Sequence, residues 1–372
     1  MGSDGELGAW WLGWPIIAIT HSLVAGCFLL LPPQIETNDD QTEHIELSGG
    51  LAPHTDPADT KCSILTTIWG DLTRLMKNKV LIFDSLALSF WLFGSTNKSY
   101  TAKFVEFQFQ TSPAKASLFS GSSTMLGMLA ALMISIILIT WFKPSARVLA
   151  GFNCLADILA VLVGISFIFL SCPHNDIKPG GDCQMDCGCT STYRPVCDQT
   201  HLQTYYSPCS AGCHTRQLTP DNSSSIFLDC SCVPGSSLVA GYCPTNCDTP
   251  LMIFLVTQFS LNFILGLGRV GNLLLHVRCV EKSDKALGMA IQEISLALIA
   301  FIPGELMFGW LVDSACLPGM WANTGCGQTG NCLGYDLQDF RTKLFGASAV
   351  SYGLAAVFDG LVWRKVKSLE IY

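Results

Sequence analysis

The chain has 372 residues, of which 49% are hydrophobic and only 13% are charged. Soluble domains usually have about 25% charged residues, so this deficit, with a mean hydropathy of +0.40, indicates that much of the surface faces lipid. The net charge of −8 offers no basic surface to nucleic acid. The composition therefore argues against a soluble enzyme and against a nucleic-acid-binding protein.

Seven hydrophobic stretches are predicted to be membrane-spanning helices. Backbone that faces lipid must satisfy its hydrogen bonds within the segment, which favours helices over other structures, and about 20 apolar residues cross a bilayer. The second stretch gives the weakest pattern, because Lys98 and Lys103 follow it closely. The stretches are residues 9–31, 80–93 or longer, 118–142, 148–169, 251–275, 286–312 and 345–363.

These stretches give the predicted domain organisation. A first membrane helix (1–31) precedes a cytoplasmic linker (32–79), three membrane helices (80–171), a cysteine-rich domain (172–249), three further helices (250–363) and a cytoplasmic tail (364–372). An outer loop, residues 313–343, joins the last two helices. The linker is acidic and rich in Pro, Thr and Gly, which is typical of a flexible segment. Apolar residues at helical spacing in 64–76 predict an amphipathic helix on the membrane surface.

Eleven of the eighteen cysteines lie between Cys172 and Cys247. Such density indicates disulfides formed in an oxidising compartment, and pairs such as Cys230 and Cys232 are spaced more tightly than a usual structural zinc site. The outer loop adds three cysteines, which makes the total even, so we hypothesise one disulfide between the two outer segments. The predicted disulfide cysteines are Cys172, Cys183, Cys187, Cys189, Cys197, Cys209, Cys213, Cys230, Cys232, Cys243, Cys247, Cys316, Cys326 and Cys332.

Independent signals agree on the orientation. With the cysteine-rich domain outside the cell, every cytoplasmic connection has a basic cluster next to a helix end, as the positive-inside rule requires. The glycosylation sequons at Asn222 and Asn97 then also lie outside. The sequence thus predicts a multi-pass membrane protein whose cysteine-rich domain is extracellular or lumenal and whose C-terminus is cytoplasmic.

Five ionisable residues lie inside predicted membrane helices, where burial is costly and a functional role is the first expectation. They are Asp84, Asp157, Arg269, Glu293 and Glu305. Arg269 is a candidate anion-binding residue, since a guanidinium can bind a carboxylate or sulfate with two hydrogen bonds. An ion pair with Asp157 or Glu293 is an equal alternative.

Other patterns favour structural roles. Gly266, Gly268 and Gly271 follow no strand, so helix packing or a hinge is favoured over a dinucleotide site. We expect His276 to be a hydrogen-bonded core residue, and a pH-sensing role is the alternative. No Ser-His-Asp, paired-carboxylate or metal-ligand pattern stands out, so neither an enzyme nor a bound cofactor or metal is predicted.

Several motifs carry a resemblance to a known family. About thirty residues of the cysteine-rich domain resemble the Kazal module. They contain Cys189, Pro195-Val196-Cys197, Tyr205-Tyr206-Ser207-Pro208-Cys209 and Cys213. A Kazal-like block between two membrane helices is similar to the organic anion-transporting polypeptides. Matching family motifs span almost the whole chain: Gly8-Ala9-Trp10-Trp11-Leu12-Gly13; Lys103 with Glu106 and Gln108; Arg278-Cys279-Val280; Ala286-Leu287-Gly288; Ile302-Pro303; Phe308-Gly309; Asp313; Cys316, Cys326 and Cys332; and Tyr335-Asp336.

The resemblance implies an all-α polytopic fold of the major facilitator type, of which this chain covers the sixth to twelfth helices, with a small disulfide-rich extracellular insert. It implies sodium-independent transport of large amphipathic organic anions, such as bile salts, steroid conjugates, prostaglandins and thyroid hormones, by alternating access. Lys103 would attract anions at the outer mouth, with a lysine at the lipid interface as the alternative. Trp10 and Trp11 fit an aromatic belt first and substrate stacking second.

Two departures from the family pattern matter. Ser295 stands where the family usually has an arginine in its eleventh helix, which puts the substrate class in doubt. Only seven of twelve helices are expected, which suggests a truncated form or a fragment whose partner is the missing N-terminal half or a full-length carrier. The alternative is a non-transporting membrane protein: a regulatory or dominant-negative subunit, or a Kazal-like ectodomain that binds proteases.

Overall fold

The computed structural model describes residues 69–172, 194–218, 225–233, 237–243, 247–281, 284–317, 320–323, 329–332 and 334–366, and residues 18, 19 and 22. The chain divides into two compact units, Met1–Leu65 and Thr66–Tyr372. Of the first predicted membrane helix, the structure describes only residues 18, 19 and 22, which are helical. The rest of this stretch and most of the linker lie outside the described residues. The end of the linker is helical over residues 69–76, which agrees with the helix predicted for 64–76.

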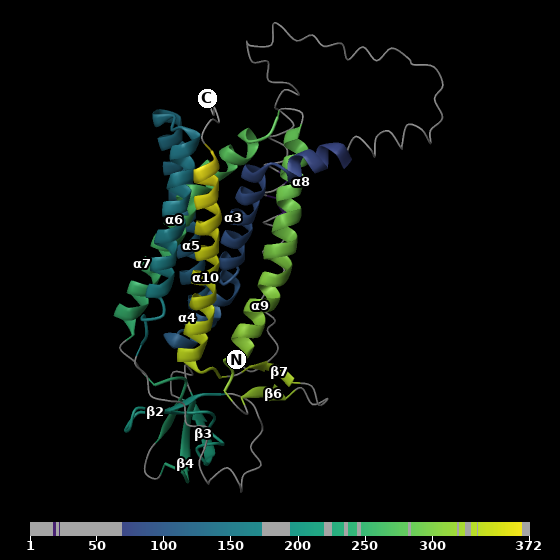
Figure 1. The fold of residues 1–372 in the computed structure, drawn as a ribbon. Helices are drawn as coiled ribbons and strands as arrows, with labels where there is room; N and C mark the ends of the chain where they lie inside the picture. Colours follow the sequence, from purple (N-terminus) through teal and green to yellow (C-terminus); the bar gives the residue numbers. More distant parts are fainter. Residues whose placement is uncertain are drawn as a thin grey trace. The chain divides into compact units, whose positions relative to one another are not determined.

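Six helical spans of the described residues are long and apolar enough to cross a membrane, and they run side by side (Figure 1). They match the second to seventh predicted stretches. The first span consists of α3 (Lys79–Ser95) and α4 (Lys98–Gln108). The next are α5 (Pro113–Phe142), α6 (Ala146–Ser166) and α7 (Asp248–Arg278). The fifth joins α8 (Lys285–Leu296), the π-helical segment η4 (Ala297–Phe301) and α9 (Ile302–Asp313), and the sixth is α10 (Leu337–Lys365).

Local sequence sets where these helices begin and end. The side chain of Asn78 caps α3 by accepting hydrogen bonds from two backbone N–H groups, and Asp336 caps α10 in the same way. Ser112 and Pro113 begin α5, which ends at Lys143 in a left-handed conformation with φ 41°. The cap at Asp336 places residues 337–343 in α10, so this helix begins about two turns before the predicted apolar stretch 345–363.

Small residues bring α5 and α7 together. A Cβ at Gly127 would lie 2.6 Å from the carbonyl oxygen of Phe259, and one at Gly266 would lie 2.7 Å from the Cβ of Ala131. Ser123 and Ser135 of α5 donate to backbone carbonyls of α7 at 2.7 and 2.9 Å. Gly268 and Gly271 face Asn153 of α6. The prediction that the three glycines of α7 serve helix packing is therefore confirmed.

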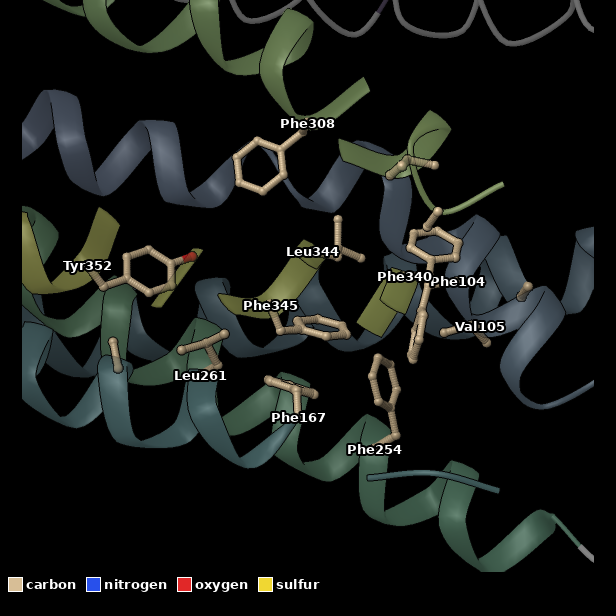
Figure 2. Packing of buried hydrophobic residues seen from close by; sticks show 14 of the residues in the cluster. Phe104, Val105, Phe167, Phe254, Leu261, Phe308, Phe340, Leu344, Phe345 and Tyr352 are labelled. Carbon is tan, nitrogen blue, oxygen red and sulfur yellow. The ribbon is translucent and has the colours of Figure 1, made fainter. Parts of the chain in front are cut away.

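Aromatic side chains form the densest part of the hydrophobic core (Figure 2). Phe104 of α4 lies at its centre, with ring centroids 5.6 Å from Phe254, 5.6 Å from Phe340 and 5.1 Å from Phe345. Phe167 stacks on Phe345 at 4.7 Å. Edge-to-face and offset stacking of this kind adds about 0.5–1.5 kcal/mol per pair beyond the burial of area. This cluster ties α4, α7 and α10 to the C-terminal end of α6.

The cysteine-rich segment contains a five-stranded antiparallel sheet of order β2-β1-β5-β4-β3. Its strands are β1 (Val196–Asp198), β2 (Gln203–Tyr205), β3 (Cys213–Leu218), β4 (Ser225–Cys230) and β5 (Leu238–Ala240). Few apolar side chains are buried in the described part of this segment, among them Val196, Ala211 and Leu238. Disulfides compensate for a small core of this kind, each by roughly 2–4 kcal/mol.

The disulfides support part of the cysteine prediction. The bonded pairs are Cys172–Cys247, Cys197–Cys243, Cys213–Cys230 and Cys316–Cys332. Cys209 and Cys232 are also disulfide-bonded, so Cys230 and Cys232 are not zinc ligands. In the last loop, which holds β6 (Trp321–Asn323) and β7 (Thr329–Cys332), two of three cysteines pair with each other. Cys183, Cys187, Cys189 and Cys326 lie outside the described residues, so the disulfide between outer segments stays a hypothesis.

Candidate functional site

Arg269 lies half-buried on α7, within a membrane-spanning segment. Its guanidinium carbon is 4.8 Å from the centroid of the Trp91 ring on α3, and one terminal nitrogen is buried without a hydrogen-bond partner in the described part of the chain. The ion pairs found among the described residues do not include Arg269, although the exposed Glu293 of α8 attracts it electrostatically. The predicted alternative, an ion pair with Asp157 or Glu293, is therefore not formed in this structure.

A small cavity between α3, α6, α7 and α10 adjoins this guanidinium. Its lining includes Arg269, Trp91, Asn153, Asp157, Asn272 and Asp359. Its volume is about 20 Å³, which is enough for one water molecule. This space is too small to hold a large anion beside Arg269.

Two carboxyl groups face each other in the same cavity. Asp157 of α6 and Asp359 of α10 lie within hydrogen-bonding reach of each other and are 6% and 5% exposed. The sequence analysis found no paired carboxylates, and this was wrong. The helices bring together two residues that are 202 positions apart, and Asp359 went unnoticed although it stands in a predicted membrane helix, like Asp84 and Asp157.

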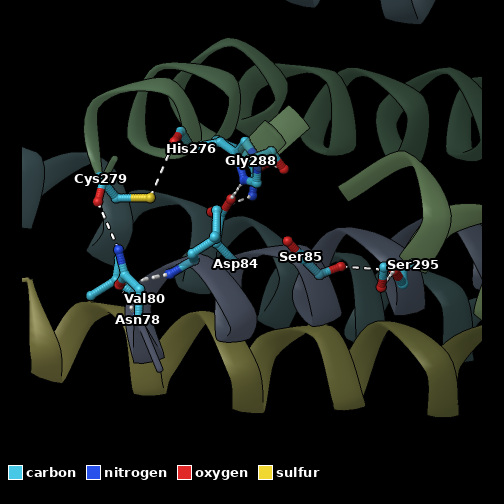
Figure 3. Close-up of polar contacts among 11 residues, drawn as sticks. Asn78, Val80, Asp84, Ser85, His276, Cys279, Gly288 and Ser295 are labelled. Carbon is cyan, nitrogen blue, oxygen red and sulfur yellow. Dashed lines mark hydrogen bonds and ion pairs between the residues drawn. The ribbon is translucent and has the colours of Figure 1, made fainter. Parts of the chain in front are cut away.

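A second buried pair lies nearby on α3 and α7 (Figure 3). The Nδ1 atom of His276 is 2.8 Å from a carboxyl oxygen of Asp84, and its Nε2 atom is 3.2 Å from the carbonyl oxygen of Gly288 on α8. Asn272 donates to the other oxygen of Asp84 at 3.1 Å. Both side chains of the pair are 1% exposed. The expectation of a hydrogen-bonded core histidine is confirmed, and the pair joins three helices.

The remaining predicted site residues lie apart from Arg269. The ammonium of Lys103 on α4 is 5.0 Å from the ring centroid of Tyr335. Glu305 is exposed and accepts a hydrogen bond from Ser99 at 3.0 Å. Ser295, at the position of the usual family arginine, bonds with Ser89 at 2.8 Å. Trp10 and Trp11 lie outside the described residues.

Sequence reasoning missed one further cation, Lys98. It lies at the start of α4, close enough to Arg269 for the two charges to repel each other. The sequence treated Lys98 only as the end of an apolar stretch, whereas α4 continues the membrane span beyond it.

The predicted glycosylation sites and metal content can be compared with the described residues. Asn97 is only 5% exposed at the junction of α3 and α4, which disfavours a glycan because an attached sugar needs surface. Asn222 lies outside the described residues. Within the described ranges, no group of three or more His, Cys, Asp and Glu side chains is placed to hold a metal ion.

Six apolar helices with charged side chains buried between them define a polytopic membrane protein with a polar site inside the helix bundle. The sequence model of the Organic Anion Transporter Polypeptide (OATP) family matches residues 5–340, and the chain belongs to this family.

Curated relatives support the same assignment. Solute carrier organic anion transporter family member 74D of Drosophila melanogaster is 28% identical over 98% of this chain and 45% of its own length. Member 1A1 of Rattus norvegicus is 27% identical over 96% of this chain and 57% of its own. Member 1C1 of Homo sapiens is 26% identical over 95% of this chain and 55% of its own. The chain thus spans about half the length of these relatives.

Proposed function

We propose that this chain takes part in the transport of organic anions across the plasma membrane, with Arg269 as the anion-binding cation. The observation that carries this proposal is a guanidinium inside a membrane span that stacks on Trp91 and keeps a buried nitrogen without a partner among the described residues. A cation in such a place is costly without a partner, and a carboxylate or sulfate would supply the missing hydrogen bonds. The names of the relatives, which are organic anion transporters, support the same substrate class.

The surroundings of Arg269 favour an amphipathic anion. Trp91, Leu88 and Leu265 line the cavity beside it, so a ligand with an anionic group on an apolar body would contact both kinds of surface. We propose that bile salts, steroid conjugates, prostaglandins and thyroid hormones are the substrate class, and that uptake does not require sodium. Lys103 and Trp10 with Trp11 remain proposed outer contacts for the same anions.

The mechanism we propose is alternating access. Carriers of the major facilitator type hold substrate between two halves near the middle of the membrane, and the cavity of about 20 Å³ within the described helices is too small to hold such a ligand by itself. We propose the orientation with the cysteine-rich, Kazal-like segment outside and the C-terminus in the cytoplasm. On this proposal the described helices supply one wall of the binding site.

The test is uptake of a labelled steroid sulfate by cells that express this chain, with surface expression measured in parallel. Charge-assisted hydrogen bonds contribute about 1.5–3 kcal/mol, so Arg269→Ala is expected to lower uptake by about 10-fold or more, and Arg269→Lys by less. The matched control is Arg147→Ala, because Arg147 also lies over a tryptophan, with its guanidinium carbon 5.8 Å from the Trp363 ring, but does not line the cavity.

Arg147→Ala should leave uptake unchanged. Equal losses in Arg269→Ala and Arg269→Lys would assign Arg269 a packing role instead. Absence of uptake at normal surface expression, with or without an N-terminal half supplied by a relative, would favour a membrane protein that does not transport.

A further inference from the structure

The charges around the Arg269 cavity require a proton inside the helix bundle. Asp157 and Asp359 are both buried and line the same small cavity. Two carboxylates this close repel each other strongly at low dielectric, and one proton shared in a hydrogen bond removes the repulsion, so the pair holds one proton and one negative charge. Arg269 lines the same cavity and carries one positive charge. The carboxyl pair and the guanidinium together are neutral while the site is empty.

The other groups around the cavity do not change this balance. His276 has acceptors at both ring nitrogens, Asp84 and the carbonyl of Gly288, so the Asp84–His276 pair shares one extra proton and is neutral as a whole. The positive charge of Lys98 repels the guanidinium of Arg269, and the negative charge of the exposed Glu293 attracts it. The neutral side chains of Tyr352 and Cys154 face the carboxyl pair from α10 and α6.

An anion bound to Arg269 would disturb this neutrality. The guanidinium charge would then be shared with the ligand, and the negative charge of the carboxyl pair would be left uncompensated at low dielectric, where an unpaired charge is expensive. A second proton on the pair would restore neutrality. Anion binding and proton binding would therefore favour each other, as linked equilibria must.

We infer that the Asp157–Asp359 pair is a proton-binding site that couples anion movement to proton movement in the same direction. The inference rests on the proposed function, because it takes Arg269 as the anion site. One proton would enter from the outer side and protonate the ionised carboxyl, the anion would bind at Arg269, and both would leave on the inner side. No covalent or redox step is involved.

The first test does not depend on transport. The infrared spectrum of the purified chain in detergent at neutral pH should contain the C=O band of a protonated carboxyl group that shifts in heavy water. Asp157→Asn should remove this band, because the introduced amide can donate to Asp359 and leave it ionised; Asp359→Asn should do the same through Asp157. The control is Asp339→Asn, which removes a partly exposed carboxylate paired with Lys343 on α10.

The control should remove only the absorption of an ionised carboxylate. Because Asp157→Asn and Asp359→Asn are tested separately, the experiment remains informative if one of these variants misfolds. If both Asp157→Asn and Asp359→Asn leave the band of the protonated carboxyl intact, the pair does not hold a proton and the inference is overturned.

The second test measures coupling. If one proton moves with each anion, each unit of inward pH gradient should raise the accumulation of labelled steroid sulfate about tenfold. A protonophore should abolish this effect of the gradient. Asp157→Asn and Asp359→Asn should make uptake independent of pH. Uptake that is insensitive to pH, or that needs sodium instead, would overturn the proton assignment. If the infrared band is present but the wild-type chain carries no anion, the proposed transport and the coupling both fail while the proton site stands.

Discussion

On our proposal, Arg269 combines a contact that stabilises the helix packing with a role in anion binding. The contact with Trp91 contributes about 0.5–2 kcal/mol, depending on how dry the site is, and so holds the guanidinium in place without using its hydrogen bonds. One nitrogen stays without a partner within the described ranges. An arginine held in this way is ready to bind an anion at small entropic cost, because the side chain is already ordered.

Outside the membrane-spanning helices, Asp198 is a buried charged residue of the cysteine-rich segment. Its carboxyl is buried, which by itself would raise its pKa, but hydrogen bonds from Thr200 and His201 outweigh burial and lower the pKa to about 2. The carboxylate holds the turn between β1 and β2. Because an unfolded aspartate has a pKa of about 3.9, Asp198 stabilises the folded segment above about pH 4, and this contribution disappears as the pH falls towards 2.

We therefore predict that Asp198→Asn weakens the β1–β2 turn at neutral pH by about 1–3 kcal/mol, the cost of losing hydrogen bonds to a charged group. Hydrogen exchange of the Thr200 and Gln203 amides in the full chain measures this. In the wild-type chain the protection of these amides should fall between about pH 4 and pH 2 relative to the membrane helices. Asp229→Asn, at an exposed carboxylate bonded to Thr215, is the control. Equal protection in Asp198→Asn and wild type would contradict the role given to Asp198.

At the scale of elements, the contact between α5 and α7 depends on the absence of side chains. Gly127 lies so close to α7 that an added Cβ would come within 2.6 Å of a backbone oxygen, whereas Gly121, two turns earlier on the same helix, has nothing within 4 Å among the described residues. Backbone cannot move aside as a flexible side chain can. The two glycines thus give a matched pair in one helix.

Gly127→Ala should lower the thermal stability of the purified chain in detergent, since overpacking typically costs about 1–3 kcal/mol. Gly121→Ala should be neutral or stabilise by about 0.5–1 kcal/mol through helix propensity. The measurement is the midpoint of thermal unfolding followed by tryptophan fluorescence. If the two variants have the same midpoint, α5 and α7 do not pack as described.

Hydropathy was sufficient to predict these helices, but not their details. Length and lack of charge identified α5, α6 and α7 because lipid demands both. The same criterion left the end of the first described span open, since Lys98 and Lys103 looked like a membrane boundary, whereas α4 carries both within the span. The π-helical turn before Pro303 also left no trace in the apolar pattern, because it depends on backbone hydrogen bonds rather than on composition.

The candidate site was only partly predictable for a related reason. Arg269, Asp84 and Asp157 stood out because a charge in an apolar stretch is rare. Which of them face one another depends on helix rotation, and a single sequence does not give that. The Asp157–Asp359 pair and the Trp91 contact of Arg269 could only be found once α3, α6, α7 and α10 were placed side by side.

At the scale of the whole molecule, buried ionisable side chains and the aromatic and disulfide-bonded contacts lie in different parts of the helix bundle. Buried ionisable side chains lie between the helices, from Asp157 halfway along α6 to the Asp84–His276 pair near the C-terminal end of α7. An aromatic cluster and two of the described disulfides lie at the end with the α4–α5, α6–α7 and α9–α10 connections. On our proposal the cysteine-rich segment stabilises and caps the carrier, and the polar interior around Arg269 moves the anion.

The most direct test of this account is equilibrium binding of a radiolabelled steroid sulfate to the purified chain in detergent, because binding does not require a second half to complete a transport cycle. The account predicts saturable binding that is weakened about 10-fold or more by Arg269→Ala, is unchanged by Arg147→Ala and grows stronger as the pH is lowered. Binding of equal strength in Arg269→Ala and wild type would contradict it.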